Sequence, residues 1–272
     1  MNAVAPSLSG GQEFDVNCLL TYKVSGLTDF LFQLHALNGR DQTVLSESLT
    51  LMPPMPVHVY NDPTELHRCT RLQVASGDFE LHYQARVLRQ VEAEDPDAGE
   101  VPILQLPDGV LQYLLPTRYC ESDLMSHAAQ KLFGGLLHGH ARVKAICDWI
   151  YTHIDYQVGT STATTTARDV FTQRAGVCRD FAHLGVTFCR ALNIPARLVA
   201  GYSNFNTPPP DFHAVFEAYL GHRWVIFDAT RMSDLDGLVR IASGRDAKDV
   251  AFATIYGPAT MTSMNPTATP VR

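Results

Sequence analysis

The 272-residue chain has no long hydrophobic run and no concentration of positive charge. No stretch approaches the roughly 18–20 consecutive apolar residues that a membrane-spanning helix needs. Acidic residues (28) outnumber basic residues (21), which gives a net charge of −7, and the bases are scattered along the chain. A nucleic-acid backbone is bound by a clustered positive surface. The sequence therefore argues against nucleic acid and against a membrane as partners.

Cysteine is also scarce, with six residues at positions 18, 69, 120, 147, 178 and 189. A chain of this length can fold without disulfides, and its start has neither the basic nor the apolar segment of a signal peptide. We therefore expect a cytoplasmic protein with free thiols. Free cysteines are commonly small buried hydrophobes, and we expect this of Cys18, Cys69, Cys147 and Cys189.

The first half of the chain reads as short strands. Residues 14–19 and 79–87 alternate apolar and polar side chains, as half-buried strands do. The prolines within residues 51–56 exclude a central strand there, because proline lacks the N–H donor. The acidic segment 92–100 is expected to be a solvated loop. Residues 1–115 are thus predicted to form an N-terminal antiparallel β domain, sandwich-like in architecture.

The second half combines helices and strands, which makes the whole chain an α+β protein. Apolar residues in 143–154 recur at helical spacing, and Thr166 with Asp169 fits a capping box for a helix ending near residue 176. A further helix is expected to begin at Cys178 and to stop before Pro195. Strands follow at 196–202, 213–220 and 223–229. We assign residues 116–272 to this second, catalytic domain.

Three residues of the second half carry chemistry. Cys178 begins a predicted helix, where unpaired N–H groups and the helix dipole favour a thiolate. His213 and Asp228 lie on neighbouring strands, and a two-residue turn at 221–222 places them diagonally on one face. A four-residue turn would place them directly opposite each other, and a one-residue slip on opposite faces. A cysteine with a His/Asp pair is the arrangement of thiol acyl transfer.

Around these residues the sequence resembles a known family. The similarity lies in residues 174–184 (RAGVCRDFAHL), residues 189–197 (CRALNIPAR), Gly201-Tyr202, His213-Ala214, Trp224, Asp228-Ala229-Thr230 and residues 244–247 (GRDA). These blocks resemble the transglutaminase-like superfamily. The whole chain is similar to its bacterial two-domain branch of cysteine-protease-like proteins, and residues 114–123 (LLPTRYCESD) resemble the inter-domain segment of that branch. The similarity is dense over 113–250 and thin before it.

The resemblance implies a papain-like, transglutaminase-core fold and a role for each of the three residues. Cys178 would be the nucleophile, His213 the general base and acid, and Asp228 the residue that orients the imidazole. We expect hydrolysis of amide bonds in a peptide or protein through a thioester, with no metal and no organic cofactor. The oxyanion would be held by the Cys178 backbone N–H and one unidentified donor. Two alternatives stay open: γ-glutamyl transfer to an amine, and a non-catalytic peptide-binding scaffold.

Several neighbouring residues allow two interpretations. His183 fits either the site or the core, and Asp180 fits either the site or ordinary pairing with the helix dipole. His138 and His140 suggest a metal site, but no third ligand stands at a suitable spacing. The Thr/Ser stretch 160–166 is a loop that would form one wall of a cleft. The proline run 208–210 suggests a cleft rim.

Overall fold

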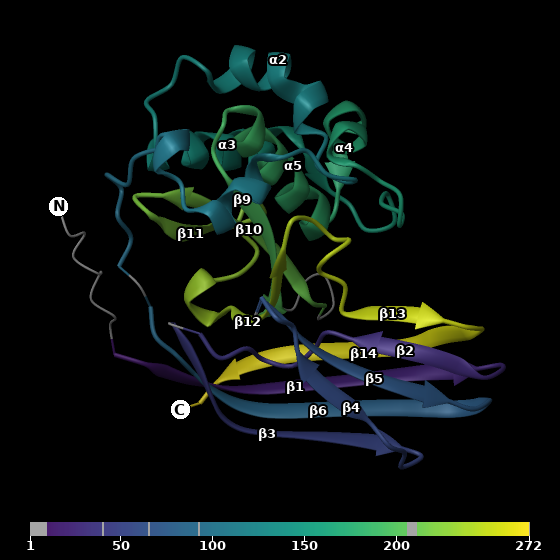
Figure 1. Ribbon diagram of the computed structural model, residues 1–272. Helices are drawn as coiled ribbons and strands as arrows, with labels where there is room; N and C mark the ends of the chain where they lie inside the picture. The colour runs from purple at the N-terminus through teal and green to yellow at the C-terminus, as the bar shows by residue number, and fades with distance from the viewer. Residues whose placement is uncertain (1–9, 40, 65, 92, 206–210, 272) are drawn as a thin grey trace.

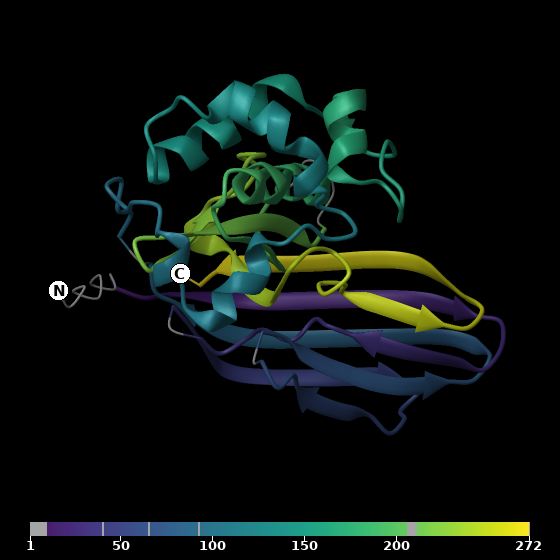
Figure 2. The same cartoon turned by 45° about the horizontal axis from the view of Figure 1, so that its top comes forward.

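The computed structural model describes residues 10–39, 41–64, 66–91, 93–205 and 211–271. Three layers follow one another: helices, a central sheet and a two-sheet β sandwich (Figures 1 and 2). Among the helices of the described residues, none is long and apolar enough to cross a bilayer. The cytoplasmic location stays a prediction; residues 1–9, on which it partly rests, lie outside the described residues.

The sandwich consists of two four-stranded antiparallel sheets. The first has the strand order β14-β1-β6-β3 and the second β13-β2-β5-β4. The strands are β1 (Gln12–Val24), β2 (Thr28–Phe32), β3 (Gln42–Met52), β4 (His58–Asn61), β5 (Arg68–Val74), β6 (Gly77–Arg89), β13 (Ala253–Tyr256) and β14 (Ala259–Pro270). Every second residue of β1 and β6 is buried, as the alternating pattern predicts. Tyr22, Phe30, Phe32 and Phe79 meet between the sheets with ring centroids 5.2–6.4 Å apart.

Both ends of the chain contribute to this sandwich. β14 lies antiparallel to β1, with Phe14 opposite Pro270, and β13 lies antiparallel to β2. The predicted division after residue 115 places these last strands with the second domain, whereas the structure pairs them with strands of the first half. Edge strands need partners for their backbone N–H and C=O groups, and β14 supplies them to β1. The sequence of β14 gives no indication of which sheet it joins.

The second half is built around a four-stranded antiparallel sheet with the order β11-β10-β9-β12. Its strands are β9 (Ala196–Tyr202), β10 (His213–Leu220), β11 (Arg223–Phe227) and β12 (Val239–Gly244). The helices are α1 (Asp108–Leu111), α2 (Ser122–Phe133), α3 (His140–His153), α4 (Ala167–Gln173) and α5 (Cys178–Ala191). The predicted helix start at Cys178 and the capping box of Thr166 with Asp169 are confirmed. The helix that follows Thr166 ends at Gln173, earlier than expected.

The β10–β11 hairpin has the predicted register. Gly221 and His222 both have positive φ, as the two central residues of a tight hairpin turn require. Leu220 consequently pairs with Arg223, and Phe216 with Phe227. The register places Asp228 directly after the end of β11.

The acidic segment before α1 is not simply a solvated loop. Ala98 is buried, its carbonyl accepts a hydrogen bond from the His140 backbone N–H (2.9 Å), and the Gly99 carbonyl accepts one from Gly221 N–H (2.8 Å). Glu100 accepts a hydrogen bond from the Gly139 N–H at 3.0 Å. Backbone pairing to α3 and to the hairpin thus overrides the polar composition of this segment.

Candidate active site

The thiol of Cys178 lies at the first residue of α5, the most buried helix of the described structure. A two-stranded parallel pair leads into this helix: β8 (Ala175–Gly176) pairs with β7 (Asp155–Tyr156). The pairing fixes the chain directly before Cys178. The Cys178 side chain is 8% exposed, and its Sγ lies 3.9 Å from the Phe212 carbonyl oxygen. This contact brings the thiol next to the first residue of β10, His213.

The ring of His213 lies between the two other predicted residues. Its Nε2 is 2.9 Å from Asp228 Oδ2. Its Nδ1 is buried without a hydrogen-bond partner among the described residues, and Cys178 is close enough for its charge to act on this ring. Asp228 is held in turn by Thr230, whose N–H and hydroxyl donate to Oδ1 at 2.8 and 2.7 Å. The structure therefore brings Cys178, His213 and Asp228 together in one chain of contacts.

The electrostatics of this chain favour a charged imidazole. Burial lowers the pKa of His213, but the hydrogen bonds and charges of Asp228 and Cys178 outweigh burial and raise the pKa to about 9. Burial raises the pKa of Asp228, whereas the hydrogen bond and charge of His213 and the Thr230 bonds lower it to a net value below the ordinary one. At neutral pH the arrangement therefore holds an imidazolium between a carboxylate and a thiol.

Sequence reasoning missed two contributors to this site. Thr230 follows Asp228 by two residues, and this i, i+2 spacing is the signal that could have indicated the turn. Tyr156 pairs with Gly176 across the parallel β7–β8 pair, and no local pattern predicts such a pairing. Tyr156 lies close to Cys178: burial, followed by the charge of Cys178, raises the pKa of the Tyr156 hydroxyl.

The other candidates have structural roles. His183 is fully buried, accepts a hydrogen bond from the Ala247 N–H at 3.1 Å, and stacks on Tyr119 at 5.3 Å. His140 and His138 contact Glu94 and Glu100 respectively, each at 3.2 Å. Among the described residues no group of three His, Cys, Asp or Glu side chains is arranged to hold a metal ion. The proline run 208–210, predicted as a cleft rim, lies outside the described residues.

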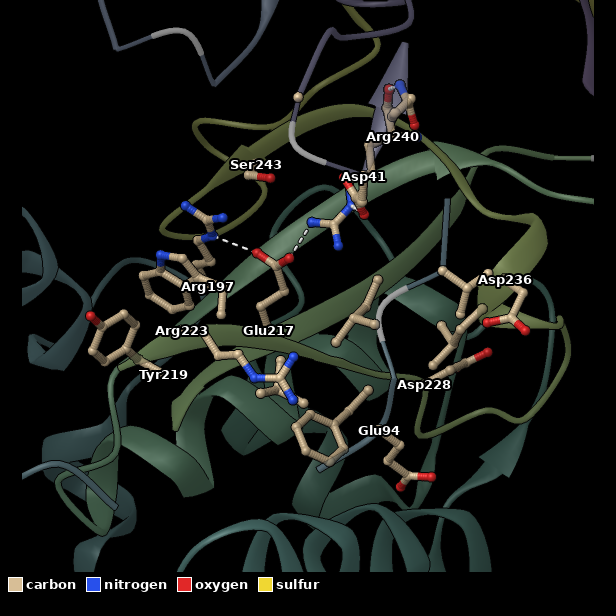
Figure 3. A pocket seen from close by; sticks show the side chains of 18 of the residues that line it. Asp41, Glu94, Arg197, Glu217, Tyr219, Arg223, Asp228, Asp236, Arg240 and Ser243 are labelled. Atoms are coloured by element: carbon tan, nitrogen blue, oxygen red, sulfur yellow. Dashed lines mark hydrogen bonds and ion pairs between the residues drawn. The ribbon is translucent and has the colours of Figure 1, made fainter. Parts of the chain in front are cut away.

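A cavity of about 880 Å³ lies between the central sheet and the sandwich; Asp228 lines it, but Cys178 and His213 do not. Figure 3 shows Glu217 in this cavity between Arg197 and Arg240. Glu217 is 1% exposed and accepts from Arg197 at 2.6 Å, and Arg240 also contacts Asp41 at 3.3 Å. This network joins the sheet to the sandwich, so we assign it a structural role.

We expect Cys178 to be the most reactive of the six free thiols. Cys178 and Cys69 are 8% and 6% exposed, so access alone gives them similar rates. Burial raises the pKa of both Cys18 and Cys120 to about 12, whereas Cys178 lies at the start of α5 and close to His213. With iodoacetamide at pH 6.5, Cys178 should alkylate about 10–100-fold faster than Cys69 by peptide mapping. Equal rates for the two would contradict the thiol–imidazole pairing.

A helix that begins at a cysteine, packed on an antiparallel sheet that carries a histidine, is the papain-like arrangement. Comparison with known families agrees: residues 126–229 match the model of the transglutaminase-like superfamily, and residues 12–109 match that of the bacterial transglutaminase N-terminal domain. A crystal structure of a putative cysteine protease from Cytophaga hutchinsonii is 42% identical. That match covers 98% of this chain and 93% of the other, with a TM-score of 0.94. The chain belongs to the transglutaminase-like superfamily.

Two mycobacterial proteins are also similar. An uncharacterized protein of Mycobacterium leprae is 26% identical over 194 residues, which cover 67% of this chain and 70% of that protein. An uncharacterized protein of Mycobacterium tuberculosis is 40% identical over 60 residues, or 22% of this chain and 19% of that protein. The similarity to these two proteins thus extends over part of this chain only.

Proposed function

We propose that this protein hydrolyses amide bonds of a peptide or protein by thiol acyl transfer through Cys178, His213 and Asp228. The observation that carries the proposal is the chain of contacts from Asp228 to His213 Nε2 (2.9 Å) and on to Cys178, whose Sγ lies 3.9 Å from the carbonyl oxygen of Phe212, the residue before His213. The similarity to a protein described as a putative cysteine protease supports the choice of hydrolysis. The intact set of three residues is more than a peptide-binding scaffold needs.

The proposed reaction proceeds in two halves. The Cys178 thiolate attacks the carbonyl carbon, the C–N bond breaks, and the His213 imidazolium gives its Nδ1 proton to the departing amine. A thioester remains on Cys178. Neutral His213 then takes a proton from water as the water attacks the thioester, and the acid product leaves with the thiolate restored. Asp228 holds the imidazole through Nε2, so Nδ1 faces the reacting atoms throughout.

We further propose that Tyr156 is the second oxyanion donor. The backbone N–H of Cys178 belongs to the first turn of α5, whose N–H groups have no partner within the helix, and Tyr156 lies close to this residue. A donor at that place is aimed at the oxygen that becomes negative in the transition state. Burial and the charge of Cys178 raise the pKa of Tyr156, so its hydroxyl keeps its proton at neutral pH and can donate it.

Tyr156→Phe should lower kcat about 10–100-fold with little change in KM, because the lost hydrogen bond is made mainly in the transition state. Tyr151→Phe is the matched control, since Tyr151 is an exposed tyrosine on α3. Steady-state kinetics on a cleaved peptide measure both. A KM increase with unchanged kcat would instead indicate that Tyr156 binds the substrate.

Transfer to an amine is the second candidate, because the N-terminal match is to a domain described as belonging to bacterial transglutaminases. Both reactions share the thioester and differ only in the group that attacks it. The N-terminal match does not concern the residues around Cys178, and we therefore rank transfer below hydrolysis.

Mass spectrometry of a peptide library incubated with the protein, with and without a primary amine, separates these functions. Hydrolysis predicts cleaved peptides in both samples and none with Cys178→Ala. Glutamines carrying the amine, without cleavage, would replace hydrolysis by transfer. Intact, unmodified peptides that nevertheless bind the protein would favour the scaffold.

A further inference from the structure

The buried carboxylate of Asp180 lies two residues after the proposed nucleophile, Cys178. Asp180 is the third residue of α5 and its side chain is 1% exposed. One oxygen, Oδ2, accepts a hydrogen bond from the Val177 backbone N–H at 2.9 Å. The other, Oδ1, accepts one from the Ser161 hydroxyl at 3.0 Å. Each carboxylate oxygen thus holds a different segment of the chain: the residue before Cys178, and the loop that leads to α4.

Arg179 completes this arrangement from the helix side. Its Nη2 donates to the Ser161 hydroxyl at 2.7 Å and to the Thr162 carbonyl at 2.8 Å, while its Nε lies 3.7 Å from Asp180 Oδ1. Ser161 therefore donates to a carboxylate and accepts from a guanidinium at the same time. Arg179 and Asp180, the two residues that follow Cys178, therefore both hydrogen-bond to this loop.

The start of α5 relies on the Asp180 carboxylate because the side chain of the residue before the helix cannot accept hydrogen bonds from backbone N–H groups. The residue before the helix is Val177, whose side chain has no acceptor for the exposed N–H groups of the first turn. In α4, by contrast, Thr166 and Asp169 share this task, with bonds of 3.0 and 3.3 Å. Gly176 lies so close that an added Cβ would be 2.8 Å from Asp180 Cβ. The chain before Cys178 is therefore shaped around the Asp180 side chain.

We propose that Asp180 is a positioning residue for the thiol acyl-transfer reaction: it fixes the Cys178 backbone and the 161–162 loop as one unit, so that the thiol meets His213 and the loop forms a wall of the cleft. This inference rests on the proposed function. Asp180 acts through the backbone of residues 177–178 and through Ser161.

A purely electrostatic role of Asp180 and a positioning role of Asp180 predict opposite results for the Asp180→Asn variant. The groups around Cys178 are His213 from β10, Tyr156 from β7, and Arg179 and Asp180 from α5, with Asp211 near both His213 and Tyr156. If Asp180 acted only as a negative charge, Asp180→Asn would favour the thiolate and lower the pH midpoint of Cys178 alkylation. If Asp180 instead positions Cys178 against His213, the Asp180→Asn variant weakens the contact between thiol and imidazole, and the pH midpoint of Cys178 alkylation rises.

The test measures Cys178 alkylation by iodoacetamide against pH, normalised to the plateau rate so that changes in access cancel. We expect Asp180→Asn to raise the midpoint by about one pH unit and to lower kcat on a cleaved peptide about tenfold with KM within about twofold. Asp169→Asn is the matched control: it removes the equivalent carboxylate of α4 and should leave both values unchanged. A midpoint that is unchanged or lower in Asp180→Asn overturns the inference.

Two further variants keep the result interpretable. If Asp180→Asn does not fold, Ser161→Ala removes the loop's hydrogen bonds to Asp180 and to the Arg179 Nη2, keeps the Arg179–Thr162 bond, and should lower kcat about threefold; an unchanged kcat overturns the inference. His213→Ala tests the proposed function by itself. A wild-type midpoint in His213→Ala would reject the thiol–imidazole pair, whereas a raised midpoint there with an unchanged one in Asp180→Asn rejects only the positioning role.

Discussion

Replacing His213 by alanine should lower the turnover of a cleaved peptide by about 10³–10⁴-fold. The variant loses the group that removes and returns protons, and it also loses the positive charge that stabilises the Cys178 thiolate. Cys178→Ala should cost at least as much, because no thioester can form. The double variant should be no slower than the single ones, since residues that act as one unit give non-additive losses.

Asp228→Asn should reduce turnover by a smaller factor than His213→Ala, because the nucleophile and the imidazole both remain. His127→Ala is the control, as His127 is an exposed residue of α2 and should keep wild-type kinetics. Single-turnover measurements with purified, folded variants are the appropriate assay. Wild-type turnover in His213→Ala would refute the assigned role of this histidine.

Acid should destabilise the protein through His183, a buried residue outside the proposed reaction. Burial lowers the pKa of His183 to about 3; the charge of Asp246 opposes this effect, and those of Arg179 and Arg190 add to it. An unfolded histidine has a pKa near 6.5. Because the folded value is depressed, the stabilisation from neutral His183 is complete above about pH 6.5. It is lost as the pH falls toward 3, since the unfolded chain takes up the proton first.

Urea unfolding at several pH values measures this effect against His183→Gln. Glutamine can still accept the Ala247 N–H but does not titrate. From pH 6.5 to 4 the wild type should lose about 3 kcal/mol more stability than the variant. The variant should be the less stable protein at pH 7, because it loses the stacking on Tyr119, and the difference should shrink or reverse in acid. Parallel stability curves over this range would show that His183 is not the acid-sensitive group.

Local signals predict much of this structure. Alternation in residues 14–19 and 79–87 marks β1 and β6, because each strand buries one face. The apolar stripe after Cys178 marks α5, although the structure buries this helix on nearly all sides. The turn at Gly221-His222 fixes the hairpin register, and with it the proximity of His213 and Asp228. The thiol, the imidazole and the carboxylate could therefore be chosen before any coordinates.

The tertiary structure decided which distant segments of the chain lie against one another, because short-range sequence patterns do not specify such pairings. The return of β14 to β1 spans nearly the whole chain, and such pairing depends on which edge is left open rather than on the sequence of β14. Tyr156 reaches Cys178 only because β7 and β8 pair in parallel, and Ser161 reaches Asp180 only because the loop folds back on α5. The sequence by itself determined the candidate reacting groups, since their chemistry belongs to residue type and short-range spacing. The groups that hold them in place come from contacts between distant segments, which form only when the core packs.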